Sequence, residues 1–282
     1  MTSLRQVLSF RIKDLKSRAR GFWLKAFGSK ARGVSVETPW GLMLVDPRDG
    51  HVSRQLLRKG VYNPEEVDFL RSLLRPNDRM LIVGGHIGGL AIPLSKSVAS
   101  VDVVEASPSN FRLLTANVAL AGAQNMTCHH WAASETSGEI KFLLSPENSG
   151  GSKRSPAHLK RQYQYDKPAL VTVPAYPLDQ KLSDSFDVIV MDIEGSEFFA
   201  IQGGKALISS CRVFVFEFIP DHIQNVAGVT LTEFLEVLPV AGFSKVIFPR
   251  QQREVHISEL HRELEKIFQA NDYEDGVVLI RD

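Results

Sequence analysis

Short apolar runs separated by amphipathic stretches dominate the chain from about residue 80 onward. Runs such as 80–83 and 101–105 have the length and β-branched composition of buried strands. Ser107 and Pro108 begin an apolar-periodic stretch to Ala121, which predicts a capped helix. Further strands are expected at 126–131, 139–144, 170–174, 187–191, 212–218, 243–248 and 276–280, and further helices near 63–74, 90–97, 196–209 and 231–240. This alternation predicts an α/β fold: a Rossmann-like, doubly wound, mostly parallel sheet of seven strands.

The first part of the chain has a different pattern. Two apolar stretches at 34–38 and 42–45, joined by Pro39-Trp40-Gly41, predict a β-hairpin. Residues 1–32 carry nine Lys and Arg against one Asp, and their apolar positions recur near helical spacing. Such a basic amphipathic helix either packs on the domain or lies on an anionic membrane surface. We therefore expect an N-terminal extension, 1–54, before one α/β domain, 55–282.

The composition narrows the class of protein. The 282 residues have a formal net charge of only +1, which argues against a general nucleic-acid-binding protein. No apolar run approaches the roughly 20 residues that a membrane span needs. The two cysteines lie in apolar stretches, which is typical of reduced thiols in a core. We expect a cytoplasmic protein, with the inner face of the membrane as the alternative location if the basic helix binds there.

A glycine-rich turn follows the first buried strand and opens a helix. Gly84, Gly85 and Gly88 let the backbone come close to a cofactor. Glu105 ends the next strand, where a carboxylate can accept hydrogen bonds from both hydroxyls of a ribose. Together they favour a nucleoside cofactor over a structural turn and a surface acid. His86 stands where a dinucleotide fingerprint needs a glycine, which favours S-adenosylmethionine over a nicotinamide dinucleotide.

The order of the motifs resembles the FkbM family of S-adenosylmethionine-dependent methyltransferases, over roughly 55–220. Ile-Val-Gly-Gly-His-Ile-Gly at 82–88 resembles the family's Asp-Val-Gly-Ala-Asn-Ile-Gly turn. Glu-Ala-Ser-Pro-Ser-Asn-Phe at 105–111 resembles its Glu-Pro-x-Pro-x-Asn-Phe segment, and Asp-Ile-Glu-Gly-Ser-Glu at 192–197 carries its Asp-x-Glu-Gly-x-Glu signature in full. The resemblance implies a class I methyltransferase fold, S-adenosylmethionine as the cofactor and O-methylation of a sugar, glycan or polyketide-like acceptor.

Two positions depart from the family pattern. Ile82 replaces an acid that, by the resemblance, helps to hold the methionine end of the cofactor, and Val190 replaces a lysine. A degenerate, non-catalytic binding module is therefore one alternative function. A nicotinamide-dependent oxidoreductase is the other, which His86 and the absence of a Tyr-x-x-x-Lys pair disfavour.

Polar residues at the ends of two later strands are the candidates for catalysis. Ligands bind outside the carboxyl ends of the strands in open α/β sheets. Asp192, Glu217 and His222 fall there by position, and Glu217 or His222 is the expected base. For Glu217 the alternative is a structural ion pair, and for His222 an uninvolved loop histidine.

The polar stretch 146–168 lacks periodicity and predicts a long loop or lid. We expect Lys153 and Tyr163 from it, with Glu194, to bind the acceptor; a flexible solvent loop is the alternative. The spacing of His and Cys indicates no metal site. The expected cofactor contacts are Gly84, Gly85, His86, Gly88, Glu105, Ala106, Ala132 and Asp192.

Overall fold

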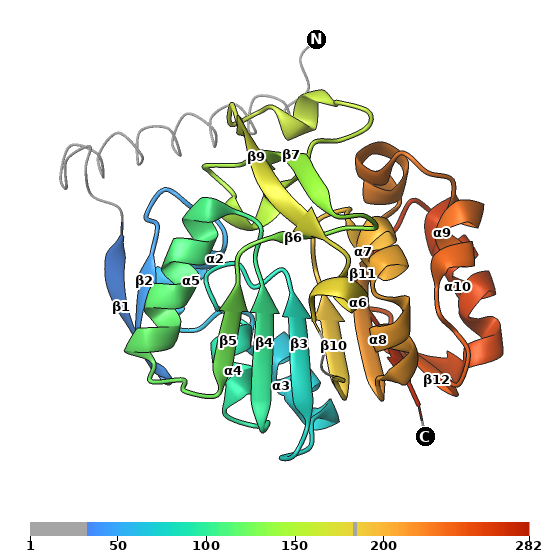
Figure 1. The fold of residues 1–282 in the computed structure, drawn as a ribbon, viewed down its shortest axis with the longest axis horizontal. Coiled ribbons are helices and arrows are strands. Elements are labelled where there is room, and N and C mark those ends of the chain that lie inside the picture. The colour runs from blue at the N-terminus through green and yellow to red at the C-terminus, as the bar shows by residue number, and fades with distance from the viewer. Residues whose placement is uncertain (1–32, 183–184, 282) are drawn as a thin grey trace, which may run out of the picture.

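The computed structural model describes residues 33–182 and 185–281. At its centre is an eight-stranded sheet in the order β13-β12-β14-β11-β10-β3-β4-β5 (Figure 1). Its strands are β3 (Arg79–Val83), β4 (Ser100–Val104), β5 (Met126–His129), β10 (Val188–Met191), β11 (Val213–Phe218), β12 (Lys245–Phe248), β13 (Arg253–His256) and β14 (Glu274–Ile280).

The strand directions are those of a Rossmann-like fold. Strands β11, β10, β3, β4 and β5 pair in parallel, and β14 is antiparallel to both β11 and β12. The predicted fold class is thereby confirmed, but the count of seven strands is wrong. The edge strand β13 pairs antiparallel with β12. Its Arg-Glu-Val-His sequence is mostly exposed, so it lacks the apolar run that marks a buried strand.

Helices cover both faces of the central sheet because its strand residues are apolar on both sides. Met80 and Ile82 belong to the core on one face, and Leu81 and Val83 to the core on the other. The first face is covered by α3 (Pro64–Leu73), α4 (Ala91–Ser95) and α5 (Pro108–Leu120). The second face is covered by α6 (Leu178–Lys181), α7 (Glu197–Gly203), α8 (Lys205–Ser210), α9 (Leu231–Val237) and α10 (Leu260–Gln269).

The starts of α5 and α3 differ in detail. Ser107 caps α5 as predicted, because its side chain accepts a hydrogen bond from the Asn110 backbone. Asn63 precedes α3 in a left-handed conformation with φ 36° and makes no side-chain cap. Its side-chain amide instead donates a hydrogen bond to the Glu66 carboxylate.

A second sheet of four strands lies above the carboxyl ends of β3, β4 and β5 (Figure 1). It has the order β6-β9-β7-β8. Its strands are β6 (Ala132–Ala133), β7 (Gly138–Leu144), β8 (Lys153–Arg154) and β9 (Ala169–Tyr176). The stretch 146–168, predicted as a loop or lid, includes β8 and is mostly irregular. The position of the second sheet brings this stretch over the carboxyl edge of the central sheet. Ligands bind at that edge in open α/β sheets.

The predicted hairpin is present as β1 (Val34–Thr38) and β2 (Gly41–Val45). It is fixed to α5 by Asn117, whose side chain accepts from the Leu44 backbone at 2.6 Å and donates back to it at 3.0 Å. Helix α2 (Val52–Lys59) follows. The division between 1–54 and 55–282 stays a prediction. The basic helix and the membrane contact predicted for residues 1–32 fall outside the described residues. Within 33–182 and 185–281, no helix is long and apolar enough to cross a membrane.

Candidate active site

A cavity of about 240 Å³, here called the glycine-turn cavity, lies at the carboxyl ends of β3, β4 and β10. The chain leaves β3 toward β4 on one side, and β10 lies on the other, so this is the point where the strand order reverses. The predicted cofactor residues that line it are Gly84, Gly85, His86, Glu105, Ala106, Ala132 and Asp192. Gly88 lies outside this lining, and a Cβ there would be 2.8 Å from the Ile92 side chain.

The glycine turn packs tightly between two strands. The Gly84 and Gly85 backbone amides both donate to the Val104 carbonyl, at 2.8 and 3.1 Å. Gly84 has φ +100°, and a Cβ on it would lie 1.9 Å from the Asp192 backbone oxygen. Only glycine therefore allows the turn to approach the end of β10 this closely.

Glu105 presents a buried carboxylate at one end of the cavity. One of its oxygens accepts from the His86 amide and the other from the Ser107 amide, both at 2.7 Å. Burial raises its pKa to about 7, although these bonds oppose the shift. The side chain has no cationic partner among the described residues. Its remaining acceptor capacity fits the two hydroxyls of a ribose.

The 146–168 stretch lines the cavity through Asn148 and Gly150, and Ser149 between them fixes the stretch in place. Its Oγ lies 2.7 Å from His86 Nε2, its backbone oxygen accepts from Asn110 at 3.0 Å, and its amide donates to Asp49 at 3.2 Å. Burial lowers the pKa of His86 to about 4, so the ring is neutral at neutral pH. The predicted lid is thus attached to the glycine turn and to α5 over the cavity.

Asp192 marks the opposite end of the cavity from Glu105, since β3 separates β10 from β4. Its side chain opens into the cavity and makes no hydrogen bond or ion pair with another described residue. Although the Asp192 side chain is exposed to the cavity, the protein around it raises its pKa above the usual range, and the charges of Glu217 and Glu194 raise it further. An uncompensated carboxylate here favours a cationic ligand.

A second cavity, here called the Tyr163 cavity, has a volume of about 200 Å³. It is lined by all three residues predicted to bind the acceptor, Lys153, Tyr163 and Glu194. Glu194 and Asn148 also line the glycine-turn cavity, so the two cavities share part of their walls. Two ligands bound in them would therefore lie next to each other, with Glu194 and Asn148 in contact with both cavities.

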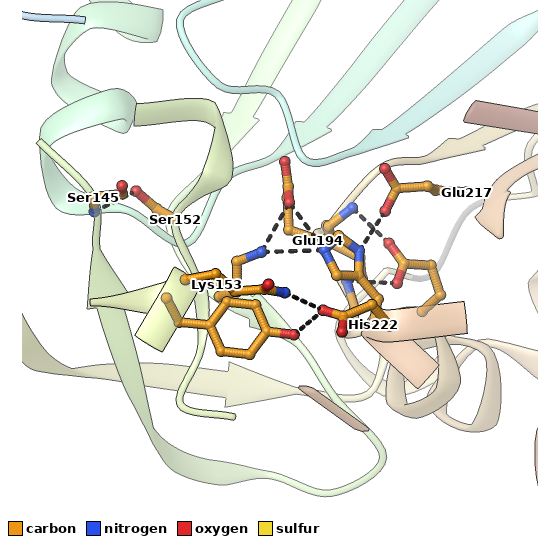
Figure 2. A network of polar contacts seen from close by, with 12 residues as sticks. Ser145, Ser152, Lys153, Glu194, Glu217 and His222 are labelled. Carbon is orange, nitrogen blue, oxygen red and sulfur yellow. Dashed lines mark hydrogen bonds and ion pairs between the residues drawn. The ribbon is translucent and has the colours of Figure 1, made fainter. Parts of the chain in front are cut away.

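A chain of polar contacts runs behind Glu194 (Figure 2). Lys153 Nζ donates to Glu194 Oε2 at 3.0 Å and to His222 Nε2 at 3.2 Å. With Nε2 accepting, the ring proton is assigned to Nδ1, which donates to Glu217 Oε2 at 3.0 Å. Neither Glu217 nor His222 lines either cavity. His222 contacts Lys153 and Glu194, which line the cavities, and Glu217 contacts His222 in turn.

The turn that carries Glu194 is strained and firmly held. Glu194 has a left-handed φ of +56°, which is uncommon for a residue with a side chain. Gly195 follows with φ +97°, and a Cβ there would lie 2.6 Å from Val226. Glu197 accepts the amides of Ile193 and Gly195, both at 2.8 Å, so this signature acid has a structural role.

The chain of contacts carries unbalanced negative charge. Burial raises the pKa of Glu217 well above its usual range, and the charge of Glu194 adds to the shift. Burial lowers the pKa of His222, and the positive charge of Lys153 lowers it further. The cluster formed by Glu194, Lys153, His222 and Glu217 is therefore suited to bind one additional proton.

Several residues that line the glycine-turn cavity were not predicted from the sequence, among them His51, Tyr62 and Glu66. Glu66 follows Pro64 at the start of α3, where an acid is typical of a helix N-terminus whether or not it binds anything. No local signal distinguishes these two roles. Among the described residues, no group of three His, Cys, Asp or Glu side chains is arranged to hold a metal ion.

Comparison with known proteins identifies the family of this chain. The sequence matches the methyltransferase FkbM domain over residues 83–274. The chain therefore belongs to the FkbM methyltransferase family. This confirms the resemblance seen in the sequence, and with it S-adenosylmethionine as the cofactor of the family fold. No curated protein sequence matches the chain.

Several solved methyltransferases have a similar structure. The methyltransferase FkbM from Methylobacillus flagellatus is 18% identical, with a TM-score of 0.44, over 74% of this chain and 45% of its own. A putative O-methyltransferase from Klebsiella pneumoniae is 13% identical, with a TM-score of 0.45, over 93% and 95%. Magnesium protoporphyrin IX methyltransferase from Synechocystis, with bound S-adenosylmethionine, is 13% identical, with a TM-score of 0.43, over 84% and 87%. The present chain thus spans less than half of the Methylobacillus protein.

Proposed function

We propose that this protein transfers a methyl group from S-adenosylmethionine to a hydroxyl oxygen of a sugar, glycan or polyketide-like metabolite. The observation that carries the proposal is the sharing of Glu194 by two cavities. A group transfer needs donor and acceptor side by side, and holding them so supplies much of the rate. In this proposal the donor occupies the glycine-turn cavity and the acceptor occupies the Tyr163 cavity.

The donor side rests on the glycine turn and on Glu105. Gly84 brings the backbone to the edge of the cavity, and Glu105 accepts hydrogen bonds from the ribose hydroxyls. Asp192, at the other end, faces the positively charged part of the donor. The remaining donor contacts in this proposal are Gly85, His86, Ala106 and Ala132, with Gly88 shaping the turn.

The acceptor side combines aromatic and polar groups. Tyr163 and Tyr165 offer aromatic faces, while Lys153, Gln162 and Glu194 offer donors and acceptors of hydrogen bonds. A ligand pocket of this kind orients its ligand by a few placed polar groups. This composition supports a polyhydroxylated acceptor over an apolar one.

Bound S-adenosylmethionine supplies an activated methyl group, whose bond to sulfur breaks with the electron pair staying on sulfur. A lone pair of the acceptor oxygen forms the new bond to carbon, and the hydroxyl proton passes to the protein. Glu194 faces both cavities and is the first acceptor of that proton in this proposal. His222 and Glu217 lie behind it and hold the proton further from the acceptor. A positioned base of this kind adds about 10²–10⁴-fold to the rate.

The alternative function, a non-catalytic binding module, has one observation in its favour. Ile82 and Val190 both line the glycine-turn cavity, so two positions that are polar in the family are apolar here. A protein of this kind binds the cofactor weakly or binds without turnover.

The test is a methyl-transfer assay with labelled S-adenosylmethionine on a panel of sugars, glycans and polyketide-like alcohols. We expect label in at least one hydroxyl acceptor, and we expect Glu194→Gln to lower turnover about 10²-fold or more. Glu139→Gln, which changes an exposed acid on β7, is the matched control. Cofactor binding with no labelled acceptor would favour the binding module.

A further inference from the structure

The glycine-turn cavity lacks the family's acid at one end but has another acid there. Ile82 and Val190 form an apolar part of the wall beside Asp192. Glu66, from the first turn of α3, lines the same cavity. The sequence has no acid at the family's position on the strand, and the fold brings one in from the preceding helix.

The Glu66 carboxylate is incompletely paired. Its Oε2 accepts a hydrogen bond from the Asn63 side chain, and it forms no ion pair with a cation among the described residues. Burial raises its pKa, so the protein around it does not compensate the charge. An acid that only complemented the helix dipole would be exposed and stabilised in its charged form. Glu66 is half-buried and faces the cavity instead.

Glu66 lies at the Asp192 end of the cavity. Its negative charge acts on Asp192 and on Tyr62, which both line that end. Glu105 stands beyond β3 at the other end, where the ribose is proposed to bind. The two ends together match a ligand with a neutral sugar at one end and a cation at the other.

We propose that Glu66 binds the α-ammonium group of the donor and so replaces the acid that Ile82 lacks. The proposal rests on the proposed function, because it needs the donor in the glycine-turn cavity. Asp192 shares the site and faces the same positive charge. The ammonium would offset the cost of desolvating the Glu66 carboxylate, so the site needs no lysine or arginine of the chain as a partner for Glu66.

The experiment is calorimetric titration of the whole chain with two ligands. S-Adenosylhomocysteine has the amino-acid end, and 5′-methylthioadenosine lacks it but keeps the ribose and base. We expect Glu66→Gln to weaken S-adenosylhomocysteine binding about ten- to hundredfold and to leave methylthioadenosine binding unchanged. Glu65→Gln, an exposed acid in the same turn, should change neither dissociation constant.

Each outcome decides between the proposals. An unchanged S-adenosylhomocysteine affinity in Glu66→Gln, or an equal loss for both ligands, would overturn the role of Glu66 while leaving the donor site intact. A wild-type protein that binds neither ligand would overturn the donor site itself, and the role of Glu66 with it. Introducing Ile82→Asp into Glu66→Gln should restore S-adenosylhomocysteine binding if the two acids are interchangeable.

Discussion

Lys153 Nζ lies 3.0 Å from Oε2 of Glu194, a residue that lines both cavities. The lysine is 8% exposed and also donates to His222, so a single ammonium group connects a cavity acid to the histidine behind it. The positive charge of this lysine disfavours protonation of His222 and of Glu217, two of the groups that are proposed to receive the acceptor proton.

Lys153→Met should raise the pKa of His222. The positive charge of Lys153 disfavours the imidazolium, so its removal stabilises that form, while Glu194 and Glu197 continue to favour it. The measurement is an NMR titration of the His222 ring protons. Lys160→Met, which removes a more exposed lysine paired with Asp221, is the control and should move the value less. An identical titration in wild type and Lys153→Met would disprove the coupling.

His222→Ala and Glu217→Gln should lower turnover while cofactor affinity stays nearly unchanged. Neither side chain lines the glycine-turn cavity, and a base acts on the acceptor proton only during the reaction. The expected loss in kcat is about 10²-fold or more. Asp192→Ala should weaken cofactor binding as well, because Asp192 lines that cavity. Full activity in both His222→Ala and Glu217→Gln would leave Glu194 and alignment as the better account.

The folding stability of the ligand-free protein should fall as pH rises from about 5 to 7, through Glu105. Its pKa is about 7 in the folded protein and about 4.3 in an unfolded chain, so the folded state binds the proton more tightly. The slope from this group approaches about 1.4 kcal/mol per pH unit. Denaturation of wild type and Glu105→Gln at pH 5 and pH 7.5 measures it. Equal pH dependence in both proteins would contradict the assignment.

Gly84→Ala should destabilise the protein by about 3 kcal/mol or more, because the new Cβ would lie 1.9 Å from the Asp192 backbone oxygen. Gly122→Ala is the matched control. Gly122 also has a positive φ, +58°, but a Cβ there meets nothing within 4 Å, so only the backbone strain of about 1 kcal/mol remains. Chemical denaturation gives both values. A Gly84→Ala variant as stable as Gly122→Ala would show that the turn tolerates a side chain.

The sequence predicted the part of the site that follows from local pattern. Strand ends are visible as the ends of apolar runs, so the amino-acid pattern alone places Glu105 and Asp192 at the carboxyl edge of one sheet. The cap of α5 at Ser107 could be predicted for the same reason, because it depends on neighbouring residues alone.

The rest depends on contacts between distant segments. Glu66 reaches the cavity because α3 packs beside β3, and its position in the sequence is equally typical of an acid that only complements a helix dipole. The strands at 138–144 and 169–176 could be recognised, but their pairing in a separate sheet over the site could not. Lys153 could be named as a ligand group, whereas its contact with His222, 69 residues away, is set by the whole fold.

The most direct test of the account is calorimetric titration of the wild-type chain and Glu105→Ala with S-adenosylhomocysteine, with NAD titrated in parallel. We expect S-adenosylhomocysteine to bind one site per chain, Glu105→Ala to weaken this binding by about 1.5–3 kcal/mol, and NAD to give no heat. Binding of NAD in place of S-adenosylhomocysteine, or an unchanged dissociation constant in a folded Glu105→Ala variant, would contradict it.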